Sequence, residues 1–139
     1  MSGPGPAPLE RIPFLRLIGL EQGEAPPGES RLYLPALREE LTNMLAHAHG
    51  GVLMTLLDVA MARAALSHPQ ASSGTVVTVE MSSRFVKPGT GALSVEGRVL
   101  ASGRSLCSCE AHVRDATGAL VASAMGTFKY WRGTAGGAD

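Results

Sequence analysis

Residues 43–66, NMLAHAHGGVLMTLLDVAMARAAL, constrain the fold more than any other part of the chain. Apolar residues dominate from Val52 onward and predict one long helix from about Gly50 to Ser67, with apolar side chains almost all the way round. Such a helix has to be enclosed by the rest of the domain. It nevertheless opens on His-Gly-Gly and carries an acid, Asp58, in its middle, where an unpaired buried carboxylate is costly.

The hydrophobic period changes from helical spacing to strict alternation after this helix. In the first alternating segment, Val77, Val79, Met81 and Phe85 are expected on one face. Short turn sequences, KPGTG, ASGR and DATG, separate the segments and favour antiparallel neighbours. We therefore expect a four-stranded antiparallel meander in chain order, built from TVVTVEMSSRFV, ALSVEGRVL, SLCSCEAHVRD and ALVASAMGTFKYW.

The residues before the long helix predict smaller elements. LERIPFLRLIGL indicates a short helix interrupted or restarted near Pro13. Arg31–Leu37 alternates as a strand, and Pro35 favours the edge of a sheet. A sheet curled around one apolar helix buries both, so the predicted fold class is α+β with an antiparallel sheet around one central helix. We expect a single domain over residues 1–139, with flexible tails at 1–8 and 133–139.

Charge and composition limit the partners. Lys+Arg and Asp+Glu both number 12, so the net charge is zero, and hydrophobic residues make up 45% of the chain. Nucleic acid and anionic membranes favour a basic excess, so neither is expected as a partner, whereas a homo-oligomer is compatible with this neutrality. The N-terminus has no signal-peptide pattern, and no uncharged apolar run is long enough to span a bilayer. The expected location is therefore cytoplasmic.

The two cysteines, Cys107 and Cys109, lie two apart on an expected strand. Side chains at that spacing lie on one face and rarely form a disulfide. We interpret both as reduced core residues, with a Cys-x-Cys metal or redox site as the alternative.

The pattern Asn43, His49-Gly50-Gly51 and Asp58, followed by the strand sequences above, resembles the hotdog-fold acyl-CoA thioesterases of the PaaI-like (phenylacetyl-CoA thioesterase) branch. The resemblance extends from about Leu15 to Trp131. It implies hydrolysis of acyl-CoA to a free acid and CoA. It also implies no metal and no cofactor, because CoA enters only as part of the substrate.

The same resemblance implies a role for each site residue. Asp58 would be the nucleophile or the general base, and the Gly50 N–H would polarise the thioester carbonyl. His49 and Asn43 would orient the thioester or the attacking water, which Thr78 would help to place. Active sites in this family are shared across a dimer, and two dimers often form a tetramer. Residues expected to bind the CoA part of the substrate are Gly51, Arg84, Lys87 and Arg104.

Physical chemistry supports parts of this assignment. The first N–H groups of a helix have no internal partners, and glycine leaves them open to a ligand, so Gly50 suits a developing oxyanion. Asp58 lies eight residues further on, about 12 Å along the axis. Asp58 and Gly50 of one chain cannot easily act on one carbonyl, but antiparallel helices across a two-fold axis would bring Asp58 near the second chain's Gly50. We therefore expect at least a dimer.

Several alternatives stay open. His47 and His49 could form a sparse metal pair with one downstream acid. His49 could simply cap the helix, and Asp58 could be a structural acid paired with Arg63 or with a donor of another chain. The function could be a hydratase or dehydratase acting on acyl thioesters, or a non-catalytic acyl-CoA-binding module. The sequence does not identify the acyl group.

Overall fold

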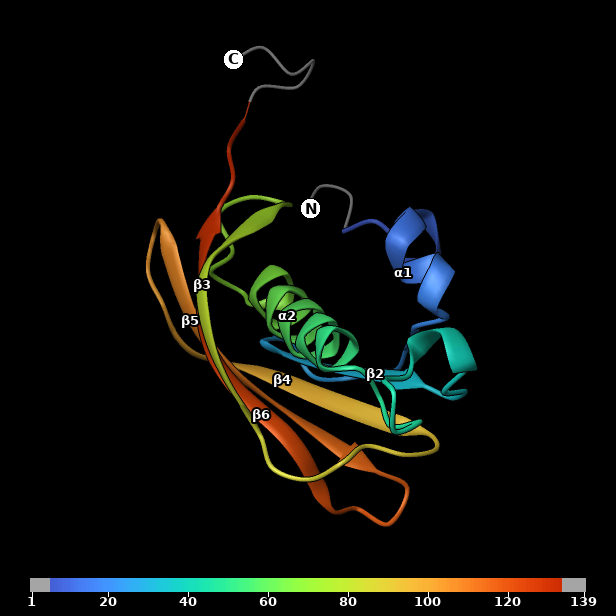
Figure 1. Ribbon diagram of the computed structural model, residues 1–139. Coiled ribbons are helices and arrows are strands. Elements are labelled where there is room, and N and C mark those ends of the chain that lie inside the picture. Colours follow the sequence, from blue (N-terminus) through green and yellow to red (C-terminus); the bar gives the residue numbers. More distant parts are fainter. Residues whose placement is uncertain (1–5, 134–139) are drawn as a thin grey trace.

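The computed structural model describes residues 6–133. A single antiparallel sheet curls around one long helix, α2 (Gly50–Ser67), and a short helix, α1 (Pro13–Ile18), lies on the open side of α2 (Figure 1). The α+β class and the bounds of the long helix are confirmed. The strands are β1 (Glu21–Gln22), β2 (Glu29–Leu34), β3 (Val76–Phe85), β4 (Leu93–Ser102), β5 (Leu106–Asp115) and β6 (Leu120–Tyr130), and short 3-10 turns are η1 (Leu9–Arg11) and η2 (Glu39–Leu41).

The order across the sheet is β1-β2-β4-β5-β6-β3. The neighbours β4, β5 and β6 follow the expected meander, but β3 pairs with β6 rather than β4, so the predicted first hairpin is wrong. Crossing from β3 to β4 takes three strand spacings, roughly 14 Å. The link, residues 86–92, reaches roughly 23 Å when extended, so it does not force adjacent strands to pair. In this strand order, β3 forms one edge of the sheet.

Of the N-terminal elements, the short helix restarts where expected, whereas the strand has other bounds. Pro13 is the first residue of α1, where its missing N–H is not needed, which confirms the restart near this residue. The predicted strand Arg31–Leu37 is instead β2, which begins at Glu29 and ends at Leu34, before Pro35. Because β2 lies between β1 and β4, the prediction of an edge strand is wrong.

Strand β3 contains a β-bulge. Its register with β6 shifts between Thr78 and Glu80. Thr78 lies opposite the buried Phe128, and Met81 packs against the core, whereas Val77 and Val79 are 40% and 55% exposed. The expected common face for Val77, Val79, Met81 and Phe85 is therefore wrong, because the extra residue of a bulge reverses the alternation.

The sheet covers most, but not all, of α2. The helix packs closely on β4 at Gly97, where an added Cβ would lie 2.5 Å from the Ala60 carbonyl oxygen. A stripe on the other side stays uncovered within the single chain, so the prediction of full enclosure is wrong. Asp58 lies on this stripe and is half-buried rather than buried. The stripe consists of Gly51, Met54, Thr55, Asp58, Val59 and Ala62.

The apolar character of α2 reflects its place as the core helix. By length and mean hydropathy, 1.4 over 18 residues, α2 could cross a membrane. Half of that window is buried inside the protein, and the sheet wraps the helix, so the core accounts for its composition.

Both cysteines are free and buried on β5. Their sulfur atoms lie 3.7 Å apart, and burial raises the pKa of the Cys109 thiol well above its usual range. The interpretation of both as reduced core residues is confirmed.

Candidate active site

The start of α2 is organised by two polar side chains. His49 is the N-cap residue, and its Nδ1 accepts a hydrogen bond from the Gly51 N–H at 2.9 Å. The Asn43 side-chain oxygen accepts from the backbone N–H groups of Leu45 and His47, at 2.9 and 3.1 Å. His49 therefore caps the helix, as one of the alternatives held, and Asn43 shapes the loop before it. The His49 ring is exposed and leaves Nε2 free of this cap.

Gly50 presents its backbone to open space. Among residues 6–133, the Gly50 N–H has no hydrogen-bond partner, and an added Cβ would meet nothing within 4 Å. The fold of a single chain therefore does not require glycine at this position. Glycine would be required there if a ligand or a second chain approaches the N–H, because a side chain would then block the approach.

Asp58 and Thr78 come together from α2 and β3. The Thr78 hydroxyl donates to Asp58 Oδ1 at 2.6 Å. The bulge after Thr78 lies beside this contact, and bulges often re-aim a side chain next to a functional site. Asp58 forms no ion pair with Arg63, so the alternative of a structural Asp58–Arg63 pair is wrong. One carboxylate oxygen is thereby fixed, and the other is left for a ligand or water.

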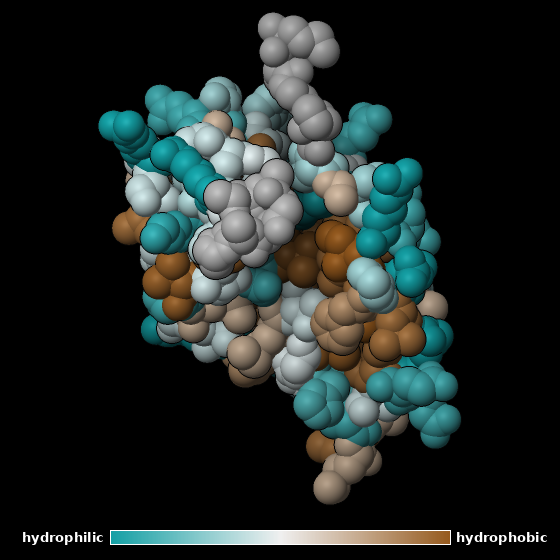
Figure 2. Space-filling view, turned by 90° about the horizontal axis from the view of Figure 1, so that it is seen from above, coloured by the Kyte–Doolittle hydropathy of each residue, from teal (hydrophilic) through white to brown (hydrophobic). Residues whose placement is uncertain are grey.

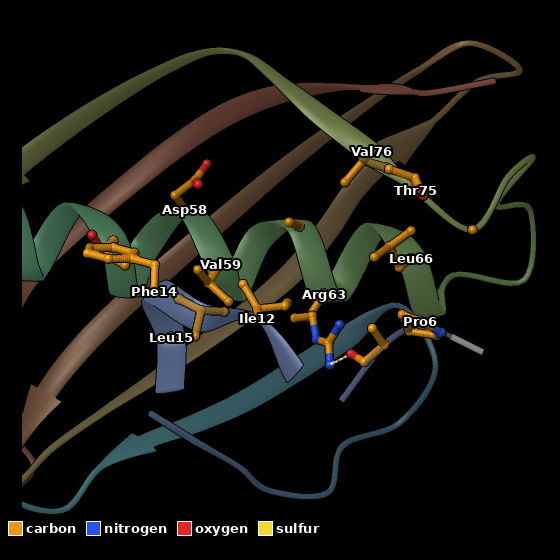
Figure 3. A pocket seen from close by; sticks show the side chains of 14 residues that line it. Pro6, Ile12, Phe14, Leu15, Asp58, Val59, Arg63, Leu66, Thr75 and Val76 are labelled. Carbon is orange, nitrogen blue, oxygen red and sulfur yellow. Dashed lines mark hydrogen bonds between the residues drawn. The ribbon is translucent and has the colours of Figure 1, made fainter. Parts of the chain in front are cut away.

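Asp58 lies on the wall of a cavity of about 460 Å³ beside α2. In Figure 3, Asp58 points from α2 toward β3, and Phe14, Leu15 and Ile12 approach from below the helix. Figure 2 shows hydrophobic side chains gathered in a hollow on this face. A mostly apolar cavity with a few polar groups is typical of sites that bind small molecules. The remaining walls include Pro6, Ala7, Thr55, Val59, Ala62, Arg63, Leu66 and residues 74–76.

The site residues expected from the sequence line three different hollows. Gly50 and Asn43 line a hollow of about 430 Å³ that also contains Lys87. His49 and Gly51 line another of about 720 Å³. The cavity at Asp58 is the third, so one chain does not bring Asp58 together with the Gly50 N–H. This separation agrees with the helical distance of about 12 Å.

Two residues that the sequence did not reveal connect these hollows. Phe14 and Thr55 line both the Asp58 cavity and the His49 hollow. Thr55 lies one turn before Asp58, a spacing that could have indicated its position on the same face. Phe14 comes from α1, and nothing in its local sequence indicates contact with this site. The Asp58 cavity and the His49 hollow therefore lie next to each other along α2, with Phe14 and Thr55 as shared walls.

The basic residues expected at CoA are exposed but dispersed. Lys87 Nζ pairs with the Asp115 carboxylate at 2.9 Å, near the end of the sheet where α2 begins. The Arg104 backbone carbonyl accepts a hydrogen bond from Ser72, at the end where α2 has finished. Arg84 is exposed on β3. Within one chain, Lys87 and Arg104 therefore cannot meet on one small group.

The alternative of a His47–His49 metal pair lacks a third ligand. Within residues 6–133, no three His, Cys, Asp or Glu side chains are arranged to hold a metal ion. The Cys107–Cys109 pair of the Cys-x-Cys alternative likewise lacks a third ligand within these residues.

Comparison with known proteins shows the family. Residues 45–122 match the model of the thioesterase superfamily. The chain belongs to this superfamily. A provisionally assigned esterase from Saccharolobus solfataricus is 32% identical over 127 residues, 91% of this chain and 83% of the relative. This chain is therefore a superfamily member of the esterase and thioesterase type.

Solved structures of the superfamily share the fold. A thioesterase family protein from Silicibacter pomeroyi has a TM-score of 0.80 at 26% identity, over 87% of this chain and 90% of the other. The PaaI protein of E. coli, from the phenylacetic acid degradation operon, has a TM-score of 0.79 at 20% identity, over 88% and 86%. The hotdog fold and the resemblance to the thioesterase superfamily are confirmed, and the likeness to PaaI is one of fold.

Proposed function

We propose that this superfamily member is an acyl-CoA thioesterase that hydrolyses an aryl- or medium-chain acyl-CoA to the free acid and CoA. The observation that carries the proposal is the half-buried Asp58 carboxylate, held by the Thr78 hydroxyl at the wall of an apolar cavity. The apolar walls suit the acyl group, and the carboxylate suits activation of water or direct attack.

The reaction needs a base and an oxyanion site. With Asp58 as the base, the carboxylate takes a proton from water as its oxygen attacks the thioester carbonyl carbon. The carbon–sulfur bond then breaks, and the CoA thiolate leaves and takes up a proton. With Asp58 as the nucleophile, the carboxylate attacks the carbonyl carbon, the carbon–sulfur bond breaks and the CoA thiolate leaves and takes up a proton. Water then hydrolyses the acyl–Asp58 anhydride to the free acid and the Asp58 carboxylate. In both routes the Gly50 N–H stabilises the oxyanion, and Asn43 and the free His49 nitrogen orient the reacting groups.

The site is completed by a second copy of the chain in this proposal. The Asp58 stripe of α2 is uncovered, and edge strand β3 exposes Val77 and Val79. Pairing two chains across a two-fold axis would cover these residues and bring Asp58 of one α2 toward Gly50 of the other. We infer a shared-site dimer, with a tetramer formed from two dimers. The cytoplasm is the proposed location, and the reaction uses no metal or cofactor besides the CoA of the substrate.

Two inactivating variants test the shared site. Gly50→Pro removes the N–H donor, and proline suits the first helical position because His49 is already extended, with ψ 141°. Asp58→Asn removes the base or nucleophile and preserves the shape. Each homodimer is expected to lose about 100-fold or more in kcat, measured as thiol release from a panel of acyl-CoAs. Gly50→Ala keeps the N–H and adds only a methyl group where the ligand would approach, so it should lose less activity than Gly50→Pro.

Heterodimers made from the two variants decide between the arrangements. One of the two shared sites then contains both Asp58 and the Gly50 N–H, so roughly half of the wild-type activity should return. If each chain instead builds its own site, every site carries one lesion and no activity returns. Wild-type protein that binds acyl-CoA without turnover would indicate a binding module and overturn the proposed activity.

A further inference from the structure

Arg63 is the only charged residue among residues 6–133 that is buried, at 8% exposed. It leaves α2 on the opposite side from Asp58 and lines the same cavity (Figure 3). The mechanism proposed for Asp58 does not use this side chain. A buried guanidinium needs a physical reason, because removing a charge from water is costly unless it is paired.

The partners of Arg63 leave its charge unbalanced. Nη2 donates to the Ala7 carbonyl oxygen at 2.7 Å and to Gln22 Oε1 at 2.9 Å, and both acceptors are neutral. The buried Nε has no hydrogen-bond partner within residues 6–133. No carboxylate of these residues forms an ion pair with Arg63, and the exposed Glu10 attracts it only through space. Burial lowers the Arg63 pKa, yet arginine stays charged in proteins.

We propose that the cavity takes an acyl chain whose far end carries a carboxylate, and that Arg63 pairs with this carboxylate. The inference rests on the proposed thioesterase function and specifies its substrate class. A carboxylate is the anion that matches the planar guanidinium, and it would balance the charge that the protein leaves unpaired.

The spacing within the cavity fits such a chain. Arg63 lies five residues after Asp58, about 7.5 Å along the axis of α2. Taking carbon–carbon bonds of about 1.5 Å, an extended acyl chain of roughly eight carbons is longer than this axial offset, which allows for the two side chains leaving α2 on opposite sides. Between the two polar ends, the walls are apolar, with Ile12, Val59 and Ala62 among them. A dicarboxylic acid joined to CoA at one end has the same polar–apolar–polar order.

A purely structural role for Arg63 is the competing explanation. Its bonds to Ala7 and Gln22 tie the N-terminal segment and β1 to α2. Loss of that tie would weaken turnover of all substrates alike, since it would disturb the cavity wall. A substrate-pairing role would change the ratio between carboxylated and uncarboxylated substrates instead.

The test compares kcat/KM for suberoyl-CoA and octanoyl-CoA, which differ only in the terminal group. Wild-type protein should favour suberoyl-CoA by about tenfold or more, the effect of one charge-assisted hydrogen bond. Arg63→Gln should abolish this preference, so that the ratio of kcat/KM between the two substrates falls to about one. Gln22→Leu is the matched control, because it removes a neutral partner of Arg63 but keeps the charge, so the preference should persist.

Each outcome separates this inference from the proposed function. Turnover of octanoyl-CoA with no wild-type preference for suberoyl-CoA overturns the role of Arg63 and leaves the thioesterase standing. If folded Arg63→Gln keeps the wild-type ratio of kcat/KM between the two substrates, the role of Arg63 is likewise overturned and the thioesterase function stands. No turnover of any acyl-CoA overturns both. If Arg63→Gln does not fold, inhibition of the wild type decides, because free suberate should compete with octanoyl-CoA more strongly than octanoate does.

Discussion

The Thr78 hydroxyl donates a 2.6 Å hydrogen bond to Asp58 Oδ1, which joins edge strand β3 to the one uncovered stripe of α2. The bond fixes the carboxylate at the wall of the cavity beside α2. The position of Asp58 therefore depends on β3, and the bulge between Thr78 and Glu80 directly follows this contact.

Removing the Thr78 hydroxyl should impair catalysis more than substrate binding. Thr78→Val is expected to lower kcat roughly tenfold or more with little change in KM, because Asp58 loses its orientation, whereas Thr78→Ser should stay near wild type. Thr127→Val is the control, since Thr127 bonds Glu80 on β3 and does not contact Asp58. Equal activity of Thr78→Val and wild type in steady-state thiol-release assays would exclude this positioning role.

His49 has two proposed roles, capping α2 and contacting the substrate, and two variants measure them separately. His49→Ala removes the acceptor for the Gly51 N–H, which should cost about 1 kcal/mol and lower Tm by roughly 3 °C. His49→Asn restores a capping side chain, so its Tm should return toward wild type. If the free ring nitrogen also orients the substrate, kcat should stay low in His49→Asn. Recovery of both Tm and kcat would assign His49 to the cap alone.

Local patterns predicted local structure well. The bounds of α2 and its His49–Gly50 start followed from residue types and spacing, whereas Thr78 entered only through the resemblance to PaaI-like thioesterases and its bond to Asp58 was not predicted. The pairing of β3 with β6 could not be read because seven linking residues permit either neighbour. Phe14 enters the site from α1, and Arg63 lies within an apolar run. Their positions depend on packing between distant segments, which periodicity does not encode.

The turn around Asp115 should make stability depend on acid pH. The Thr117 hydroxyl, and then the Lys87 ammonium, hold the pKa of the Asp115 carboxyl well below its usual range. A carboxyl with a lowered folded-state pKa stabilises fully above its unfolded pKa of about 3.9, and loses this stabilisation as pH falls through the folded value.

Thr117→Val tests that dependence. The variant should melt below wild type at pH 7, and the difference in Tm should shrink between about pH 5 and pH 2 as Asp115 becomes protonated. Thr90→Val is the control, because the Thr90 side chain has no hydrogen bond within residues 6–133. A Tm difference that stays constant with pH would contradict the assignment to Asp115.

The exposed edge strand β3 should determine the oligomeric state. Val79 is 55% exposed on this edge, and Met125 on the adjacent β6 is 57% exposed. Such apolar edge surface favours pairing with another chain, and a lysine there disfavours it. Val79→Lys should therefore shift sedimentation from dimer or larger to monomer and lower activity in parallel, since the proposed site needs two chains.

Leu17→Lys is the control for a general surface effect, because Leu17 is 67% exposed on α1, away from β3. Its oligomeric state should match wild type. Circular dichroism of Val79→Lys should retain the signal of a folded chain, which separates dissociation from unfolding. A Val79→Lys protein that remains dimeric and active would remove β3 from the interface, and the shared site would then require a different face of the molecule.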